Sequence, residues 1–129
     1  MSDDSRDQTS NLDPRDLIWG KAKHAIERRL NHLDPDLERY VREFAYGEIY
    51  ARSNQESGLP TKTQDFLATV MLMALGNTLE IKTHLQGALN AGANEQELRE
   101  VILFAIPYLG FPRAIAAMQA LKELLATAE

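Results

Sequence analysis

The 129-residue chain contains no cysteine. This absence excludes disulfide bonds, thiolate metal ligands and thiol redox chemistry, and it fits a reducing compartment. The sequence also has no apolar run near the ~18 residues that a membrane-spanning helix needs, and no charged-then-apolar leader. We therefore expect a cytoplasmic protein that does not bind a membrane.

The chain is also short of positive charge. It has 14 Lys and Arg residues against 19 Asp and Glu residues, a formal net charge of -5, and its basic residues do not cluster. Binding to nucleic-acid phosphates requires a concentrated positive face. A nucleic acid is therefore not an expected partner.

Motifs for bound metals and cofactors are missing too. The sequence contains no His-x-x-x-His pair, no spaced cluster of carboxylates, and no Gly-x-Gly-x-x-Gly or phosphate-binding loop. The Gly-x-Ser-x-Gly motif of a serine nucleophile is absent as well. We therefore expect neither a metal nor a cofactor.

The sequence shows no strand-like alternation of apolar and polar residues, whereas signals for helix ends are frequent. Two Asp-Pro pairs, at 13–14 and 34–35, each join an N-cap to a proline suited to a first helical turn. Thr61, Asn77 and Asn94 each stand three residues before a Gln or Glu, which is the spacing of a capping box. These signals predict six helices, at 14–31, 35–52, 61–76, 77–92, 94–110 and 112–126.

The predicted fold is an all-α six-helix bundle in one domain at 13–129, preceded by a disordered tail at 1–12 that is polar and aperiodic. The helix at 61–76 is apolar on almost every side, and the helices at 94–110 and 112–126 each carry two apolar stripes. One small chain cannot bury all of this surface. Association of identical subunits is the usual solution, so we expect a homo-oligomer.

Two charged residues interrupt the apolar stripe of the helix predicted at 35–52. The stripe comprises Leu37, Val41, Phe44 and Ala45. Its period continues onto Glu48 and Arg52, where a buried charge is costly unless it is paired or used. One interpretation is a structural ion pair at a fraying helix end. The other is a pocket in which Glu48 is an acid or base, and Arg52 orients it or binds a substrate carboxylate.

Four further residues are candidates for the site. Tyr46 and Tyr50 flank the charged pair, either as hydroxyl donors or as packing residues. His84 lies at the edge of the inward face of the helix at 77–92, as a structural histidine or as an acid–base group. Arg113 stands at the start of the last helix, a place that favours anions and disfavours a cation. Either a bound carboxylate or exposure to solvent would explain an arginine there.

Four segments of the chain carry these residues in a recognisable order. They are EFAYGEIYAR (Glu43–Arg52), GLPTKTQDFLATVMLMALG (Gly58–Gly76), THLQGALNAGANEQELREVIL (Thr83–Leu103) and GFPRAIAAM (Gly110–Met118). In this order, over most of residues 38–126, the chain resembles the carboxymuconolactone decarboxylase family. The resemblance implies an all-α helical bundle that assembles as a homohexamer, often as a trimer of dimers.

Two branches of that family bear on the site. Alkylhydroperoxidase-like members carry a Glu, a Cys-x-x-Cys and a following His as a thiol relay. Counted back from His84, the cysteine positions fall on Asn77 and Glu80, and the acidic position falls on Asp65. The thiol pair is absent, so we do not expect thiol peroxidase activity.

The decarboxylase branch needs no cysteine, and it is similar to this chain in Gly47-Glu48, Arg52 and His84. The resemblance implies the cofactor-independent loss of CO₂ from 4-carboxymuconolactone, giving the 3-oxoadipate enol-lactone of aromatic catabolism. His84, partnered by Glu48, would deliver a proton, and Arg52 would hold the other carboxylate of the substrate. We expect these three side chains to meet in one partly buried cavity. The alternative is an oligomer of the same scaffold that binds or transforms another carboxylated metabolite.

Overall fold

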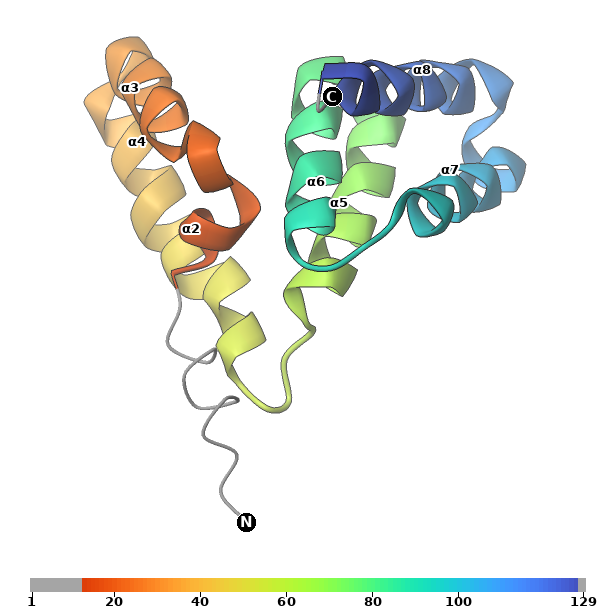
Figure 1. Cartoon of the computed structure of the whole chain (residues 1–129). Coiled ribbons are helices and arrows are strands. Elements are labelled where there is room, and N and C mark those ends of the chain that lie inside the picture. The colour runs from red at the N-terminus through yellow and green to blue at the C-terminus, as the bar shows by residue number, and fades with distance from the viewer. Residues whose placement is uncertain (1–12, 128–129) are drawn as a thin grey trace. The chain divides into compact units, whose positions relative to one another are not determined.

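A computed structural model describes residues 13–127, and the tail expected at 1–12 lies outside them. Throughout the described residues the regular elements are helices, seven of them α-helices, and no strand occurs (Figure 1). The all-α prediction is therefore confirmed. The chain divides between Thr61 and Lys62 into two compact units, each of which is described by itself. A single domain over 13–129 stays a prediction.

The first unit begins with three helical pieces in place of the single helix predicted at 14–31. They are α2 (Pro14–Ile18), the 3₁₀-helix η1 (Gly20–Ala22) and α3 (Lys23–Leu33). The Asp13 carboxylate accepts a hydrogen bond from the Arg15 N–H, so the predicted N-cap is confirmed. The continuous α-helix is wrong, because the chain leaves the α-helical conformation at Gly20, whose φ is positive at 52°.

The helix predicted at 35–52 changes its type twice. It consists of α4 (Pro35–Tyr40), the π-helix η2 (Val41–Ile49) and the 3₁₀-helix η3 (Tyr50–Asn54). A π-helix closes its hydrogen bonds over five residues instead of four, so the α-helical period does not carry through it. The expected buried stripe is wrong for this reason. Leu37 and Phe44 expose 42% and 54% of their surface, and Glu48 and Arg52 are exposed as well.

A small cluster rich in aromatic residues stabilises the first unit. Its buried members are Ile18, Trp19 and Tyr46, and Tyr50 packs against them. The indole Nε1–H of Trp19 donates to the Tyr46 hydroxyl over 3.1 Å, and the rings of Tyr46 and Tyr50 stack with their centroids 4.4 Å apart. These contacts join α2 to the π-helix, so the residues just before Glu48 have a fixed place in the unit.

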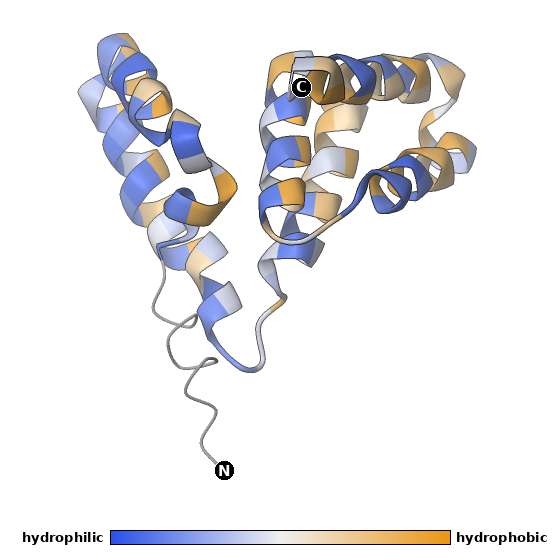
Figure 2. Ribbon diagram, viewed as in Figure 1, coloured by the Kyte–Doolittle hydropathy of each residue, from blue (hydrophilic) through white to orange (hydrophobic). Residues whose placement is uncertain are grey.

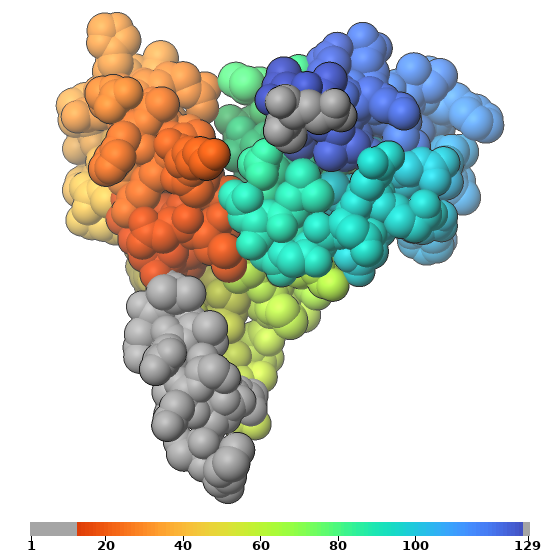
Figure 3. Space-filling model, viewed as in Figure 1, coloured from red at the N-terminus to blue at the C-terminus, as the bar shows by residue number. Residues whose placement is uncertain are grey.

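The second unit consists of four longer helices. They are α5 (Thr61–Leu75), α6 (Thr78–Asn90), α7 (Glu95–Leu109) and α8 (Phe111–Thr127). These bounds agree with the four ranges predicted from the sequence, apart from one or two residues at the ends. In Figure 1, α5 and α6 run side by side and α8 crosses one end of the pair. The surfaces of α7 and α8 adjoin in Figure 3, and the two helices contact each other.

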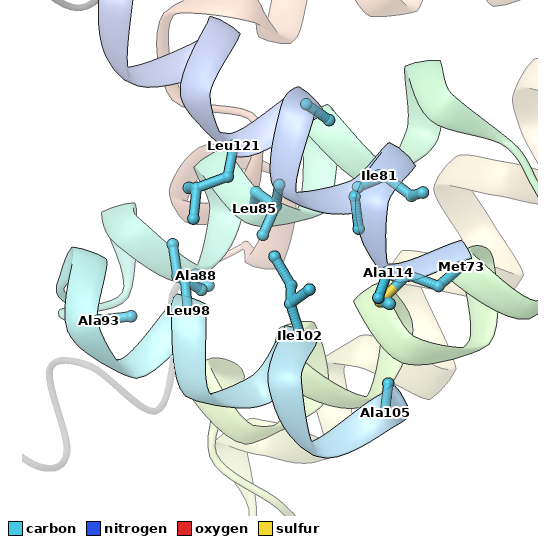
Figure 4. Close-up of a cluster of buried hydrophobic side chains, with 12 residues drawn as sticks. Met73, Ile81, Leu85, Ala88, Ala93, Leu98, Ile102, Ala105, Ala114 and Leu121 are labelled. Atoms are coloured by element: carbon cyan, nitrogen blue, oxygen red, sulfur yellow. The ribbon is translucent and has the colours of Figure 1, made fainter. Parts of the chain in front are cut away.

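The core of the second unit lies chiefly between α6, α7 and α8 (Figure 4). Its fully buried large side chains include Ile81, Leu85, Leu98, Ile102 and Leu121. Buried alanines on α8 let that helix approach its neighbours closely, since they add little volume at the contact. Met73 brings α5 into the same core.

Large apolar side chains also remain exposed on the second unit. Leu75, Phe104 and Tyr108 expose 76%, 71% and 76% of their surface. Apolar residues occur all along the ribbons of α7 and α8, between polar ones (Figure 2). None of the described helices is long and apolar enough to cross a bilayer.

The capping box of α7 yields a prediction for stability. The Asn94 side chain accepts from the Glu97 N–H over 2.8 Å, and the Glu97 carboxylate accepts from the Asn94 N–H over 3.1 Å. Replacement Asn94→Ala should lower the free energy of unfolding by about 1 kcal/mol, because an amide of the first turn loses its acceptor. Urea denaturation measures this change. The control Asn94→Ser keeps a capping oxygen and should stay within about 0.5 kcal/mol of the wild type. Equal losses in the two variants would contradict the prediction.

Candidate active site

A histidine and an aspartate form a buried pair in the second unit. His84 on α6 and Asp65 on α5 are joined by a hydrogen bond of 2.8 Å between Nδ1 and Oδ1. Asp65 is fully buried, and His84 exposes 6% of its surface. Asp65 lies on α5 and His84 lies on α6, so their hydrogen bond also links these two consecutive helices.

The helices place these two side chains by their own periodicity. Asp65, Thr69 and Met73 are the buried residues of α5, spaced four apart, so that Asp65 lies on the inward stripe of this helix. The Thr69 hydroxyl donates to the Asp65 carbonyl oxygen over 2.8 Å, which satisfies that hydroxyl within the helix. On α6, His84 lies next to Leu85 and three residues after Ile81, both of which belong to the core.

The protonation of Asp65 responds to its burial. Burial raises the pKa of the Asp65 carboxyl above its ordinary value, and the hydrogen bond and charge of His84 oppose that rise. When the carboxyl is ionised, it accepts from the Nδ1–H of His84, and Nε2 is then the nitrogen at which a proton can be gained or lost. This is the arrangement of a general acid or base whose ring is oriented by a carboxylate.

The second carboxylate oxygen of Asp65, Oδ2, lowers the stability of the charged carboxylate. Oδ2 is buried and has no hydrogen-bond partner among the residues that the structure describes. A buried carboxylate oxygen without a donor destabilises the charged form, in agreement with the direction of the pKa shift. Such a group is costly for stability alone, which favours a chemical role for the pair.

The two charged site residues predicted on the helix at 35–52 lie in the first unit and are exposed. Glu48 stands in the π-helix and Arg52 in η3, and both are exposed. No ion pair joins them in residues 13–127, so the purely structural interpretation loses its support. The turn after Arg52 is tight, because a Cβ on Gly58 would collide with the Arg52 carbonyl oxygen.

The two tyrosines differ in their surroundings. Tyr46 is buried, exposing 6% of its surface, and its hydroxyl accepts from Trp19, which is a packing role. Tyr50 is half-buried and stacks on Tyr46 with an interplanar angle of 11°. Substrate binding by either residue stays a prediction.

Arg113 lies in the second unit, at the third position of α8. It is exposed, and it lines a hollow together with residues of α5 and α6. The structure thus places His84 and Arg113 in one unit and Glu48 and Arg52 in the other. The predicted convergence of Glu48, Arg52 and His84 on one cavity stays a prediction.

The sequence alone does not single out Asp65 as a site residue. It marks Asp65 only as the position that matches the acidic residue of the alkylhydroperoxidase-like branch. The sequence signal that could have indicated its burial is spacing: Asp65 lies four residues before Thr69 and eight before Met73, on the buried face of α5. Among the described residues, no group of three or more His, Cys, Asp or Glu is arranged to hold a metal ion.

The fold and site define a class of cysteine-free helical proteins with a buried histidine–carboxylate pair. Residues 35–123 match the carboxymuconolactone decarboxylase family. The chain is 32% identical over 126 residues to 4-carboxymuconolactone decarboxylase of Acinetobacter baylyi, which covers 96% of this chain and 90% of that protein. It is 33% identical over 96 residues to nitrosuccinic acid decarboxylase of Metarhizium robertsii, which covers 72% of this chain and 64% of that protein. The chain belongs to the carboxymuconolactone decarboxylase family, as its four segments predicted.

The raised pKa of Asp65 predicts a distinctive dependence of stability on pH. The folded protein keeps a proton on this carboxyl at pH values where the unfolded chain has released it. The stabilisation is complete below the ordinary pKa of an aspartate and is lost as the pH rises through the raised value. In urea denaturation across this window, the free energy of unfolding of the wild type should fall relative to that of Asp65→Asn.

A matched control is available on the surface of the first unit. Asp36 exposes 73% of its side chain, and Asp36→Asn removes the same charge without touching the buried pair. This variant should keep the pH dependence of the wild type. Parallel stability curves for the wild type and Asp65→Asn would contradict the direction assigned to the Asp65 pKa.

Proposed function

We propose that the protein is a cofactor-independent decarboxylase in which His84 delivers the proton that replaces CO₂. The observation that carries this proposal is the buried hydrogen bond between His84 and Asp65. It provides an acid–base group with a fixed ring, and acid–base chemistry is what such a reaction asks of a protein. Both relatives described above are named as decarboxylases, which supports the same reaction class.

The reaction needs few protein groups. As the bond between carbon and carboxylate breaks, its electron pair passes into the rest of the acid, and CO₂ leaves. In a carboxylated unsaturated lactone, that pair is delocalised as a dienolate, and the protein then has to stabilise the negative charge and supply one proton to carbon. His84 supplies the proton from Nε2, and Asp65 orients the ring and stabilises its charged form.

The proposed substrate is 4-carboxymuconolactone or a related carboxylated lactone of aromatic catabolism, in the 3-oxoadipate pathway. Identity of 32% over 96% of the chain to the Acinetobacter protein supports this choice over other acids. The other relative is named for nitrosuccinic acid. In nitrosuccinic acid, too, the nitro group beside a carboxylate can accept the electron pair of the bond that breaks when CO₂ leaves. An alternative function is therefore the decarboxylation or binding of another carboxylated metabolite on the same scaffold.

Further parts of the proposal concern the first unit. Glu48 partners the proton transfer, Arg52 binds a second carboxylate of the substrate, and Tyr46 and Tyr50 add contacts to it. The exposure of Glu48 and Arg52, and the lack of an ion pair between them among the described residues, support their availability to a ligand. The π-helix that carries Glu48 supports this role as well, because such segments are frequent at functional sites.

We also propose a homo-oligomer, most simply a hexamer, in the cytoplasm. The exposed apolar side chains of the second unit support association, since a monomer rarely leaves so many uncovered. They include Leu75, Phe104, Tyr108, Phe111 and Ile115.

Turnover of 4-carboxymuconolactone with release of CO₂ tests the function. Replacements His84→Ala and Glu48→Gln should each lower kcat by at least ~10²-fold, the low end for a positioned acid or base. Arg52→Lys should chiefly raise KM, because a bidentate grip on a carboxylate is lost. Circular dichroism on each variant verifies that the helices are retained.

Two results would contradict the proposal. One is a wild-type protein that releases no CO₂ from this lactone or from nitrosuccinic acid. The other is a folded His84→Ala variant with an unchanged kcat. The surface variant Lys122→Ala, at an exposed position of α8, serves as the control and should keep the wild-type rate.

Light scattering tests the assembly. At micromolar concentration the wild type should have several times the mass of the 14.5 kDa chain. Replacement Phe104→Glu should lower that mass, because a charge would be buried in an apolar contact. A monomeric wild type would contradict the proposed assembly.

A further inference from the structure

A hollow of about 350 Å³ lies in the second unit, where the turn between α5 and α6 meets the start of α8. Its apolar lining includes Met73, Ile81 and Ala116, and Thr78 adds a hydroxyl. Of the described residues that line it, Arg113 alone is charged. A concave site of this size, mostly apolar with a few polar groups, is suited to a small ligand.

The guanidinium of Arg113 occupies space that a side chain at position 76 would fill. A Cβ built on Gly76 would collide with Nη1 of Arg113 and would lie 3.4 Å from its Cζ. Gly76 has a φ of 78°, so the turn itself also favours glycine here. The backbone of this turn therefore leaves room for the arginine head at the edge of the hollow.

Arg113 has no carboxylate partner within residues 13–127. Other arginines of the described chain do have one, as Arg15 has in Asp13 and Arg42 has in Glu38. Neither an ion pair nor a hydrogen bond occupies the guanidinium of Arg113 in that part of the chain. Its planar fork of N–H donors is thus available to an anion that enters the hollow.

We propose that this hollow binds the carboxylate of a small organic acid, with the Arg113 guanidinium as its principal donor. A carboxylate matches the guanidinium fork bidentately, and the apolar walls suit the carbon skeleton of such an acid. Thr78 also lines the hollow, and its side chain carries a hydroxyl that can donate a hydrogen bond.

The hollow borders the helix that carries His84. Ile81 lines it, and His84 lies three residues further along α6, close to one helical turn away. If the protein has the decarboxylase function proposed above, the acid bound in this hollow is its substrate. Binding of a carboxylate by the hollow does not require turnover, so the two claims can fail separately.

Calorimetric titration of the 129-residue chain with fumarate tests the site, because fumarate is a small dicarboxylate that the wild type need not convert. The wild type should bind it, and Arg113→Met should weaken binding at least about tenfold through loss of a charged donor pair. Arg113→Lys should bind with intermediate affinity, since it keeps the charge without the fork. Fumaramide, the uncharged analogue, should not bind the wild type.

The control variant is Arg99→Met, which changes net charge equally at a site on α7 where Arg99 is hydrogen-bonded to Gln96. It should bind fumarate as the wild type does. The proposal is overturned if the wild type does not bind fumarate, or if Arg113→Met binds it unchanged. It is also overturned if inorganic phosphate binds as tightly as fumarate, because the apolar walls would then contribute nothing.

Discussion

The hydrogen bond between Asp65 and His84 is the interaction on which the second unit and its proposed chemistry both depend. It joins α5 to α6 inside the protein, where Asp65 has no contact with solvent. Loss of either partner would leave the other as a buried polar group with an unmet hydrogen bond, which costs more than the bond itself contributes. The pair therefore constrains how the two helices pack, and it also keeps the imidazole ring in one orientation.

In the proposed reaction, His84 supplies the proton and Asp65 orients its ring, so few other side chains are needed for the chemistry. Burial raises the pKa of the Asp65 carboxyl, and the hydrogen bond and charge of the neighbouring imidazole oppose that rise. The hollow beside Arg113 lies within the same unit and borders α6, and it is where we propose that a small organic acid binds. The exposed apolar side chains around these helices are the surface on which subunits would associate.

The sequence predicts the second unit much better than the first. Capping residues and glycines at the turns mark α5 to α8 nearly to the residue, because each signal acts locally. Gly20, with its positive φ, and the π-helix at Val41–Ile49 lie where Trp19 and Tyr46 pack together, and no capping or periodicity signal in the sequence predicts either feature. His84 was identified as a candidate, whereas its partner was missed, because only the fold shows which acid approaches a histidine 19 positions away.

The central claim is that Asp65 and His84 act as one unit in decarboxylation. A double-mutant cycle on kcat with 4-carboxymuconolactone tests it most directly, using His84→Gln, Asp65→Asn and the two together. If the residues act together, Asp65→Asn should slow the wild type but should cause little further loss once His84 has been replaced. Equal and additive losses in the two backgrounds, or full activity without His84, would contradict the account.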